Sequence, residues 1–296
     1  MIKYFFILLF FLNTSQASDI INITFLGTGT PRPNIDKLGP SILLKYQNDE
    51  ILFDVGRGTT IRLEQLNNNY TKIDNIFISH MHFDHIVGLA DFWLTSSLWQ
   101  KKTNTNIYGP KGIKKFCSQI KKLYEKDLEY RYENNSYNQL NCLYHQDVKK
   151  YNNLLSITPF KNDHGHVDNS YGFKINFGNK KIIYSGDTTY SKNVINNSKN
   201  ADILIHEVIS VSKKIYDNNK KLRKVVNSHT NVSQLIQILN ICKPKLTILN
   251  HALLFGVNEQ SVLTRIAKEY NGKVIFAKDF MSVDLGEEIN IFNTGK

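Results

Sequence analysis

The chain is poor in the residues that mark several protein classes. It has three cysteines among 296 residues and no CxxC pair, so the spacing of a thiolate zinc site or a redox motif is missing. Its glycines (16) and prolines (6) are too few for collagen, and 41% apolar residues are too many for a disordered chain. The near-average composition also excludes a coiled coil. Acidic residues are outnumbered, 26 against 37 Lys and Arg, so the net charge of +11 excludes a halophile-like surface and attracts anions generally.

Long apolar runs are missing except at the start of the chain. Lys3 precedes an apolar run over residues 4–12, and Ser15-Gln16-Ala17 has the small residues that a signal peptidase reads. The alternative is a membrane anchor, but a spanning helix needs about 20 apolar residues. We therefore expect a signal peptide over residues 1–17 and one mature domain over residues 18–296. The mature protein would be periplasmic or secreted and would not be held in a membrane.

The three cysteines admit two interpretations. Export to an oxidising compartment would allow Cys117 and Cys142, the nearer pair, to form a disulfide. The interpretation we favour is that Cys117, Cys142 and Cys242 are buried thiols that pack as small hydrophobic residues.

Strand-like and helix-like segments alternate along the mature chain. Short runs of branched and aromatic residues between turn residues predict strands at 21–26, 41–46, 51–55, 75–79, 107–108, 156–160, 171–177, 181–185, 201–206, 245–249, 274–277 and 289–292. Apolar periodicity predicts helices at 59–66, 86–99, 112–124, 231–241 and 259–270. The segment 125–153 is ambiguous. This alternation predicts an α/β fold in which two central sheets are flanked by helices.

The histidines carry the chemical signal. Three of the nine fall in the segment Ser79-His80-Met81-His82-Phe83-Asp84-His85, directly after the predicted strand 75–79. Without a metal, such a cluster would lack partners and its protonated rings would repel one another. Neutral imidazole and carboxylate are good zinc ligands. The spacing therefore predicts a metal site in which His80 and His82 face one ion while Asp84 and His85 face another.

These residues resemble the motifs of the metallo-β-lactamase-fold hydrolases, and the resemblance covers nearly all of the mature chain. Asp54, in Phe53-Asp54-Val55-Gly56, is similar to the first motif, whose Asp is usually structural. The resemblance implies an αββα sandwich with two mixed sheets, and two Zn²⁺ ions, for which Mn²⁺ or Fe²⁺ could substitute. It further implies these ligands: His80, His82, His164 and Asp187 for one ion, and Asp84, His85, His251 and the bridging Asp187 for the other.

The finer resemblance is to the branch of tRNase Z and the secreted arylsulfatase-like enzymes. Phe25-Leu26-Gly27-Thr28-Gly29-Thr30-Pro31 is similar to their shared opening, and His206-Glu207 and Ser228-His229-Thr230 are similar to two later motifs. The resemblance implies that Glu207 orients His229, which assists the leaving group. It implies that Asp84, besides ligating metal, accepts a proton from the attacking water. His206 is as easily a structural residue, and His145 and His166 match no motif.

The expected function is hydrolysis of sulfate or phosphate (di)esters by a metal-bridged hydroxide. His164 and Asp187 are close in sequence and Gly178-Asn179 reads as a plain hairpin turn, which leaves no room for the tRNA-binding arm usual in tRNase Z. With export, this favours an arylsulfatase-like enzyme acting on a small anionic ester, so that nucleic acid is the less favoured substrate. The alternatives are a tRNase Z-type 3′ endoribonuclease and a non-catalytic zinc-binding interaction protein. Enzymes of this branch are often dimers, so the resemblance is also compatible with a homodimer.

Overall fold

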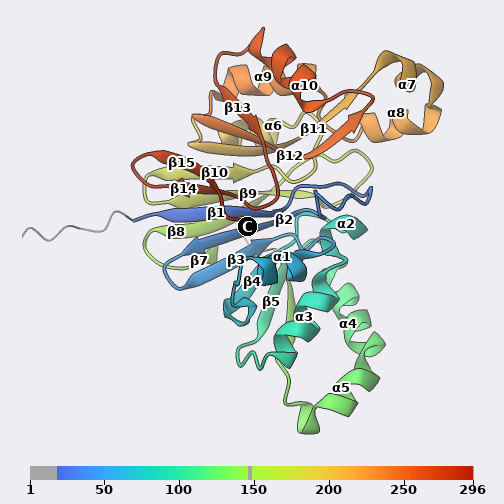
Figure 1. The fold of residues 1–296 in the computed structure, drawn as a ribbon, viewed down its shortest axis with the longest axis vertical. Helices are drawn as coiled ribbons and strands as arrows, with labels where there is room; N and C mark the ends of the chain where they lie inside the picture. The colour runs from blue at the N-terminus through green and yellow to red at the C-terminus, as the bar shows by residue number, and fades with distance from the viewer. Residues whose placement is uncertain (1–18, 146–148, 296) are drawn as a thin grey trace, which may run out of the picture.

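Two β-sheets lie face to face, and helices cover the outer face of each sheet (Figure 1). The predicted α/β sandwich of two mixed sheets flanked by helices is therefore confirmed. The computed structural model describes residues 19–145 and 149–295. The predicted signal peptide over residues 1–17 lies outside the described residues.

The first sheet has eight strands in the order β15-β14-β1-β2-β3-β4-β5-β6. Pairing is antiparallel from β15 to β3 and parallel from β3 to β6. The strands are β1 (Ile21–Gly27), β2 (Ser41–Tyr46), β3 (Asp49–Phe53), β4 (Ile73–Phe77), β5 (Thr105–Gly109), β6 (Leu140–Tyr144), β14 (Met281–Leu285) and β15 (Ile289–Asn293).

The second sheet has seven strands in the order β13-β12-β11-β10-β9-β8-β7. Pairing is antiparallel from β7 to β10 and parallel from β10 to β13. The strands are β7 (Lys149–Lys150), β8 (Leu155–Lys161), β9 (Tyr171–Phe177), β10 (Lys180–Tyr184), β11 (Ile203–Val211), β12 (Leu246–Phe255) and β13 (Lys273–Phe276). Each sheet therefore has an antiparallel part and a parallel part, and the loops that follow parallel strands can converge at one edge.

Helices bury one face each against the sheets. The first sheet carries α1 (Thr59–Gln65), α2 (Phe83–Ile86), α3 (Leu89–Leu98), α4 (Ile113–Leu123) and α5 (Glu125–Arg131), and short 3₁₀ turns lie at Tyr70–Lys72 and Glu133–Asn135. The second sheet carries α6 (Lys192–Ser198), α9 (Val232–Cys242) and α10 (Glu259–Ala267). The remaining helices, α7 (Lys213–Asn218) and α8 (Lys220–Val226), form a hairpin that projects from the body at the upper right of Figure 1.

The apolar residues form three buried layers. The central layer lies between the two sheets, where Phe53 of β3 meets Phe173 of β9 with ring centroids 5.2 Å apart. A second layer lies beneath α1, α3 and α4 and includes the fully buried Trp93. A third lies beneath α6, α9 and α10. Alternating strand residues thus face either the central layer or a helix layer, which fixes the register of each strand.

The structure departs from the predicted elements in a few places. The expected helix at 86–99 corresponds to α3, which begins only at Leu89, and the separate short helix α2 precedes it and ends at Ile86. A side chain at Gly88 would lie 2.3 Å from the Gly56 carbonyl, and the Gly88 amide donates to the carbonyl of Val55 (3.0 Å), so the chain bends around this close approach. Helices α6, α7 and α8 and strand β14 were not predicted, and the ambiguous segment 125–153 contains α5, β6 and β7.

Cys117 of α4 and Cys142 of β6 form a disulfide, with Cα atoms 6.4 Å apart. The expectation of three free thiols is therefore wrong, because α4 packs directly against β6 and brings together two residues that are 25 positions apart. Cys242 is the remaining free thiol and is buried.

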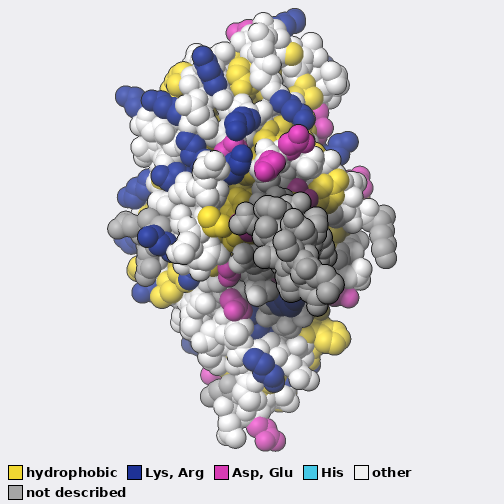
Figure 2. Space-filling view, turned by 90° about the vertical axis from the view of Figure 1, so that its left-hand side faces the viewer, with side chains coloured by type: hydrophobic (Ala, Val, Ile, Leu, Met, Phe, Trp, Pro, Cys, Tyr) yellow, Lys and Arg dark blue, Asp and Glu magenta, His cyan; other side chains and the backbone are white. Residues whose placement is uncertain are grey.

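Within the described residues, no helix has both the length and the apolar character that crossing a bilayer requires. The positive charge expected from the composition is spread over the surface. Figure 2 shows Lys and Arg side chains over the upper half of the molecule, on the side that faces left in Figure 1.

Candidate metal centre

Loops from both sheets bring the predicted ligand residues to one end of the sandwich. The loop after β4 carries His80 and His82, and α2 begins directly afterwards and carries Asp84 and His85. The second sheet supplies the rest: His164 follows β8, Asp187 follows β10 and His251 lies within β12. Their potential ligand atoms fall into two groups, each within 4.8 Å: His80, His82, His164 and Asp187 in one, and Asp84, His85 and His251 in the other.

In the first group, three imidazole nitrogens and one carboxylate oxygen point at a common centre. His82 Nδ1 lies 2.9 Å from His80 Nε2 and 3.3 Å from His164 Nε2. Asp187 Oδ2 lies 3.8 Å from His80 Nε2 and 3.9 Å from His164 Nε2. A neutral imidazole has one N–H donor and one acceptor nitrogen, so these three nitrogens cannot all be hydrogen-bonded to one another.

In the second group, Asp84 Oδ2 lies 3.2 Å from His251 Nε2 and 3.7 Å from His85 Nε2. Asp187 reaches this group as well: its Oδ2 lies 3.5 Å from His85 Nε2 and its Oδ1 lies 3.5 Å from His251 Nδ1. The Asp187 carboxylate therefore lies between the two groups, with atoms near residues of each.

Several polar atoms of the two groups are buried and have no hydrogen-bond partner among the described residues: Asp84 Oδ1, His85 Nε2, Asp187 Oδ1 and His251 Nδ1. An unsatisfied buried polar atom costs about 1–3 kcal/mol. Divalent ions would satisfy these atoms, and a donor set of imidazole and carboxylate suits Zn²⁺, Mn²⁺ or Fe²⁺. The residues present therefore fit the metal pair that the sequence predicts.

Burial and neighbouring charges shift the pKa values of the site, lowering those of two histidines and raising that of a third. Burial lowers the pKa of His80 well below its usual value and that of His82 to about 4, so both rings are neutral. Burial would raise the pKa of Asp187, but the nearby His251 and His85 outweigh it and hold that pKa well below its usual range. Burial likewise opposes a raised pKa at His85, but Asp187 and Asp54 prevail, so positive charge is favoured between these carboxylates.

Asp54 supports the ligand cluster through contacts with Ser79 and with the candidate ligand His85. Its buried carboxylate accepts hydrogen bonds from the Ser79 amide (2.7 Å), the Ser79 hydroxyl (2.9 Å) and the Tyr184 hydroxyl (2.7 Å), and lies 2.9 Å from His85 Nδ1. The contact fixes the tautomer of His85 and leaves Nε2 for the centre. The sequence indicated a structural Asp here, but nothing in it pointed to Tyr184.

Glu207 and His229 form a buried pair beside the second group. His229 Nδ1 lies 3.4 Å from Glu207 Oε1, which also accepts the Thr230 amide (2.7 Å). Burial opposes protonation of His229, but the Glu207 carboxylate outweighs it and raises the pKa of His229 to about 9. His229 also has a ring nitrogen within 4.8 Å of ligand atoms of Asp187 and His251.

The other histidines lie outside these groups. His206 is buried in β11, and its Nδ1 lies 2.7 Å from the Glu207 carbonyl. His145 Nε2 donates to the Ile78 carbonyl (2.8 Å), and the exposed His166 lies 3.5 Å from the Ser228 hydroxyl. None of the three is in a ligand group of the described residues.

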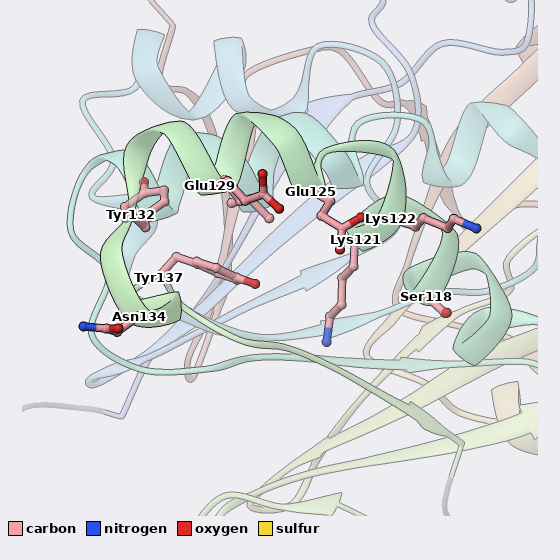
Figure 3. A pocket seen from close by; sticks show the side chains of 9 residues that line it. Ser118, Lys121, Lys122, Glu125, Glu129, Tyr132, Asn134 and Tyr137 are labelled. Atoms are coloured by element: carbon pink, nitrogen blue, oxygen red, sulfur yellow. The ribbon is translucent and has the colours of Figure 1, made fainter.

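A hollow of about 440 Å³ is lined in part by the residues of β12 that directly follow His251. Its wall includes Arg32 and Lys37 and the strand residues 252–255. A larger hollow of about 630 Å³ lies elsewhere, between α4, α5 and the chain that follows (Figure 3). Lys121 and Lys122 there are balanced by Glu125 and Glu129, and no His or Cys lines it, so it offers neither metal ligands nor a nucleophilic thiol.

Comparison with known proteins agrees with this geometry. The family profile described as Anti-Pycsar protein Apyc1 matches residues 21–248. The chain belongs to this family. Ribonuclease Z of Archaeoglobus fulgidus is 24% identical, with 90% of this chain and 98% of that protein aligned. Ribonuclease Z of Pyrococcus abyssi is 30% identical over 64% of this chain and 74% of its own length.

The fold is also that of a solved structure, the metallo-β-lactamase fold protein YhfI from Bacillus subtilis. Its TM-score is 0.70 and its identity 20%, over 90% of this chain and all of that one. This Apyc1-family chain is therefore a metallo-β-lactamase-fold hydrolase of the tRNase Z branch, and it is a metal-dependent enzyme that acts on ester bonds.

Proposed function

We propose that the chain is a phosphodiesterase that uses two metal ions. The observation that carries the proposal is the position of Asp187, whose two carboxylate oxygens lie near residues of both ligand groups. We assign His80, His82, His164 and Asp187 to one ion and Asp84, His85, His251 and Asp187 to the other. Two bound divalent ions supply an acidic water and neutralise the charge that grows on the phosphate oxygens.

The protein's own residues supply the proton transfers. Asp84 Oδ1 is buried and lacks a partner among the described residues, so it can accept a proton from the attacking water. His229 is protonated at neutral pH because of Glu207, and its Nδ1 faces that carboxylate. Its Nε2 is therefore the atom that donates a proton to the departing oxygen. Glu207 is a positioning residue that acts through His229.

RNA is the first candidate substrate. Relatives that align with most of this chain are named ribonuclease Z. Of the sulfate and phosphate (di)esters that the sequence led us to expect, this favours the phosphodiesters, and it favours the nuclease alternative over an arylsulfatase-like enzyme. We propose zinc as the metal, with manganese or iron as alternatives, because the donor set accepts all three.

Small phosphodiesters are the second candidate, and one observation favours them. Strands β9 and β10 are joined by a tight turn at Gly178 and Asn179, so the interval between His164 and Asp187 carries no protruding segment. A chain that lacks the tRNA-binding arm in this interval has less surface for binding a folded RNA. Nucleoside cyclic phosphates are compact members of the class to test.

We also propose that the mature chain works outside the cytoplasm. The Cys117–Cys142 disulfide supports this location, because disulfides persist in oxidising compartments. The signal peptide predicted over residues 1–17 supports it independently.

A substrate panel tests the proposed function. The protein, loaded with Zn²⁺ or Mn²⁺, is offered bis(p-nitrophenyl) phosphate, a nucleoside 3′,5′-cyclic phosphate, precursor tRNA and p-nitrophenyl sulfate. We expect turnover of phosphodiesters and none of the sulfate. Histidines 164 and 166 provide a matched pair: His164→Ala should abolish turnover and His166→Ala should retain it. Turnover of the sulfate ester alone would refute the proposal.

A further inference from the structure

The α7–α8 hairpin, defined here as residues 213–226, is strongly basic. Its exposed cations are Lys213, Lys214, Lys220, Lys221, Arg223 and Lys224. Its single acidic residue is Asp217, which already pairs with Lys213 at 2.9 Å. The hairpin therefore carries unneutralised positive charge over two short helices, and such a surface attracts polyanions.

One end of the hairpin is bonded to the strand that carries His251, and the other leads directly to residues of the metal centre. At its start, the Ser212 amide donates to the Phe255 carbonyl at the end of β12, the strand that carries His251. At its end, α8 leads within two residues to Ser228, whose carbonyl lies 2.6 Å from Nδ1 of His164. His229 follows directly. A phosphate chain with one bond at the metal centre would therefore have its neighbouring phosphates near the hairpin.

We propose that the α7–α8 hairpin binds the phosphates of single-stranded RNA on one side of the bond that is cleaved. The inference rests on the proposed function and names the part of the surface that holds its substrate. Tyr216 is partly exposed (37%), and the Arg223 guanidinium lies over its ring at 5.4 Å. An aromatic ring beside cations is the combination with which proteins hold single strands without reading their sequence.

The apolar residues of the hairpin argue against a membrane as the partner. Leu222 is buried (6% exposed), and Ile215 packs against Gly256 at the end of β12. An interfacial helix needs an apolar face that is free to enter the lipid. Since these side chains face the protein, the hairpin presents charge and not an apolar face.

Positive charge elsewhere on the molecule makes a matched control necessary (Figure 2). In the test variant, four lysines of the hairpin are replaced: Lys214→Gln, Lys220→Gln, Lys221→Gln and Lys224→Gln. In the control variant, four exposed lysines on or beside α4 are replaced: Lys111→Gln, Lys114→Gln, Lys115→Gln and Lys122→Gln. The two variants have the same net charge, so only the position of the charge differs.

Binding of a fluorescent single-stranded RNA to the metal-loaded protein is measured by anisotropy over a range of salt concentrations. His229→Ala is added to every protein, because it should slow cleavage about 10²–10⁴-fold and leave the assigned metal ligands in place. The hairpin variant should bind about 10-fold or more weakly at 0.1 M salt, and its salt slope should fall by roughly 0.7 for each phosphate that the hairpin no longer neutralises. The control variant should bind nearly as tightly as the parent protein. Equal weakening in both variants would overturn the inference.

Two further measurements separate this inference from the proposed function. Without His229→Ala, both variants should hydrolyse bis(p-nitrophenyl) phosphate at the wild-type rate, which also shows that they fold. If the wild type hydrolyses no diester and the hairpin still binds RNA, the proposed function fails and the hairpin inference stands. If the hairpin lysines govern binding to phosphatidylserine vesicles and not to RNA, the hairpin is a lipid surface and the inference is wrong.

Discussion

Glu207 Oε1 lies 3.4 Å from His229 Nδ1, and both side chains are buried at the edge of the ligand cluster. If His229 gives a proton to the departing oxygen, His229→Ala should lower kcat by about 10²–10⁴-fold, the usual contribution of a proton-transfer group. Metal content should not change, because neither assigned ligand group depends on His229. Steady-state kinetics and elemental analysis of the same preparation check both statements.

Glu207 should act only through His229. Glu207→Gln keeps an oxygen for the Thr230 amide but removes the charge that raises the pKa of His229. We expect it to lower kcat, and we expect the double variant with His229→Ala to be no slower than His229→Ala alone. Additive losses in the double variant would show that Glu207 has a separate role.

Asp279 should be a main contributor to the stability of the fold. It accepts hydrogen bonds from the Thr28 amide and hydroxyl, the Leu38 amide and the Arg62 guanidinium, whose contact is 2.9 Å. Asp279→Ala leaves the buried Arg62 charge without its partner and should lower the free energy of unfolding by about 3–5 kcal/mol. The exposed pair Lys126–Glu129 is the control, and Lys126→Ala should cost under about 1 kcal/mol in the same denaturant titration.

The disulfide should stabilise the fold and leave catalysis unchanged. It closes a loop of 25 residues between α4 and β6, and no assigned metal ligand lies in that loop. Replacing Cys117 and Cys142 with Ala should cost about 3 kcal/mol, as for loops of similar length. Cys242→Ala, at the free buried cysteine, separates the effect of the disulfide from that of removing a buried sulfur. Equal stability of the double variant and the wild type would refute the prediction.

His145 should make stability depend on pH. Burial lowers its pKa to about 4, against 6.5 for an ordinary histidine. As the pH falls, the unfolded chain takes up this proton first, so the contribution is complete above pH 6.5 and is lost between there and about pH 4. His145→Gln does not titrate, so the stability of the wild type relative to this variant should fall by about 1–3 kcal/mol across that window. Urea titrations of both proteins at several pH values measure this difference.

The sequence predicted the layers of the fold because the signals for them are local. Alternating residues in β1 and β9 and the apolar periodicity of α9 lie within single segments. The candidate ligands were also visible locally, because His80, His82, Asp84 and His85 follow one strand. In the structure, His164, Asp187 and His251 lie close to them.

What the sequence could not predict depends on interactions between distant segments. Arg62 and Asp279 are 217 residues apart, and Tyr184 reaches Asp54 across 130 residues. No periodic pattern marks such pairs, because each residue alone is an ordinary polar side chain. The α7–α8 hairpin was missed for a related reason: its helices are short and mostly polar, so they lack the apolar stripe that indicates a helix.

The proposed two-ion site requires Asp187 to serve both ions, and the number of metal ions bound per chain can be measured directly. Elemental analysis is made on the wild type, on Asp187→Ala and on the control His166→Ala after dialysis against metal-free buffer. We predict about two transition-metal ions per chain in the wild type and the control, and a loss from both positions in Asp187→Ala. A wild-type protein that retains no transition metal, or an Asp187→Ala protein that keeps its full complement, would contradict the account.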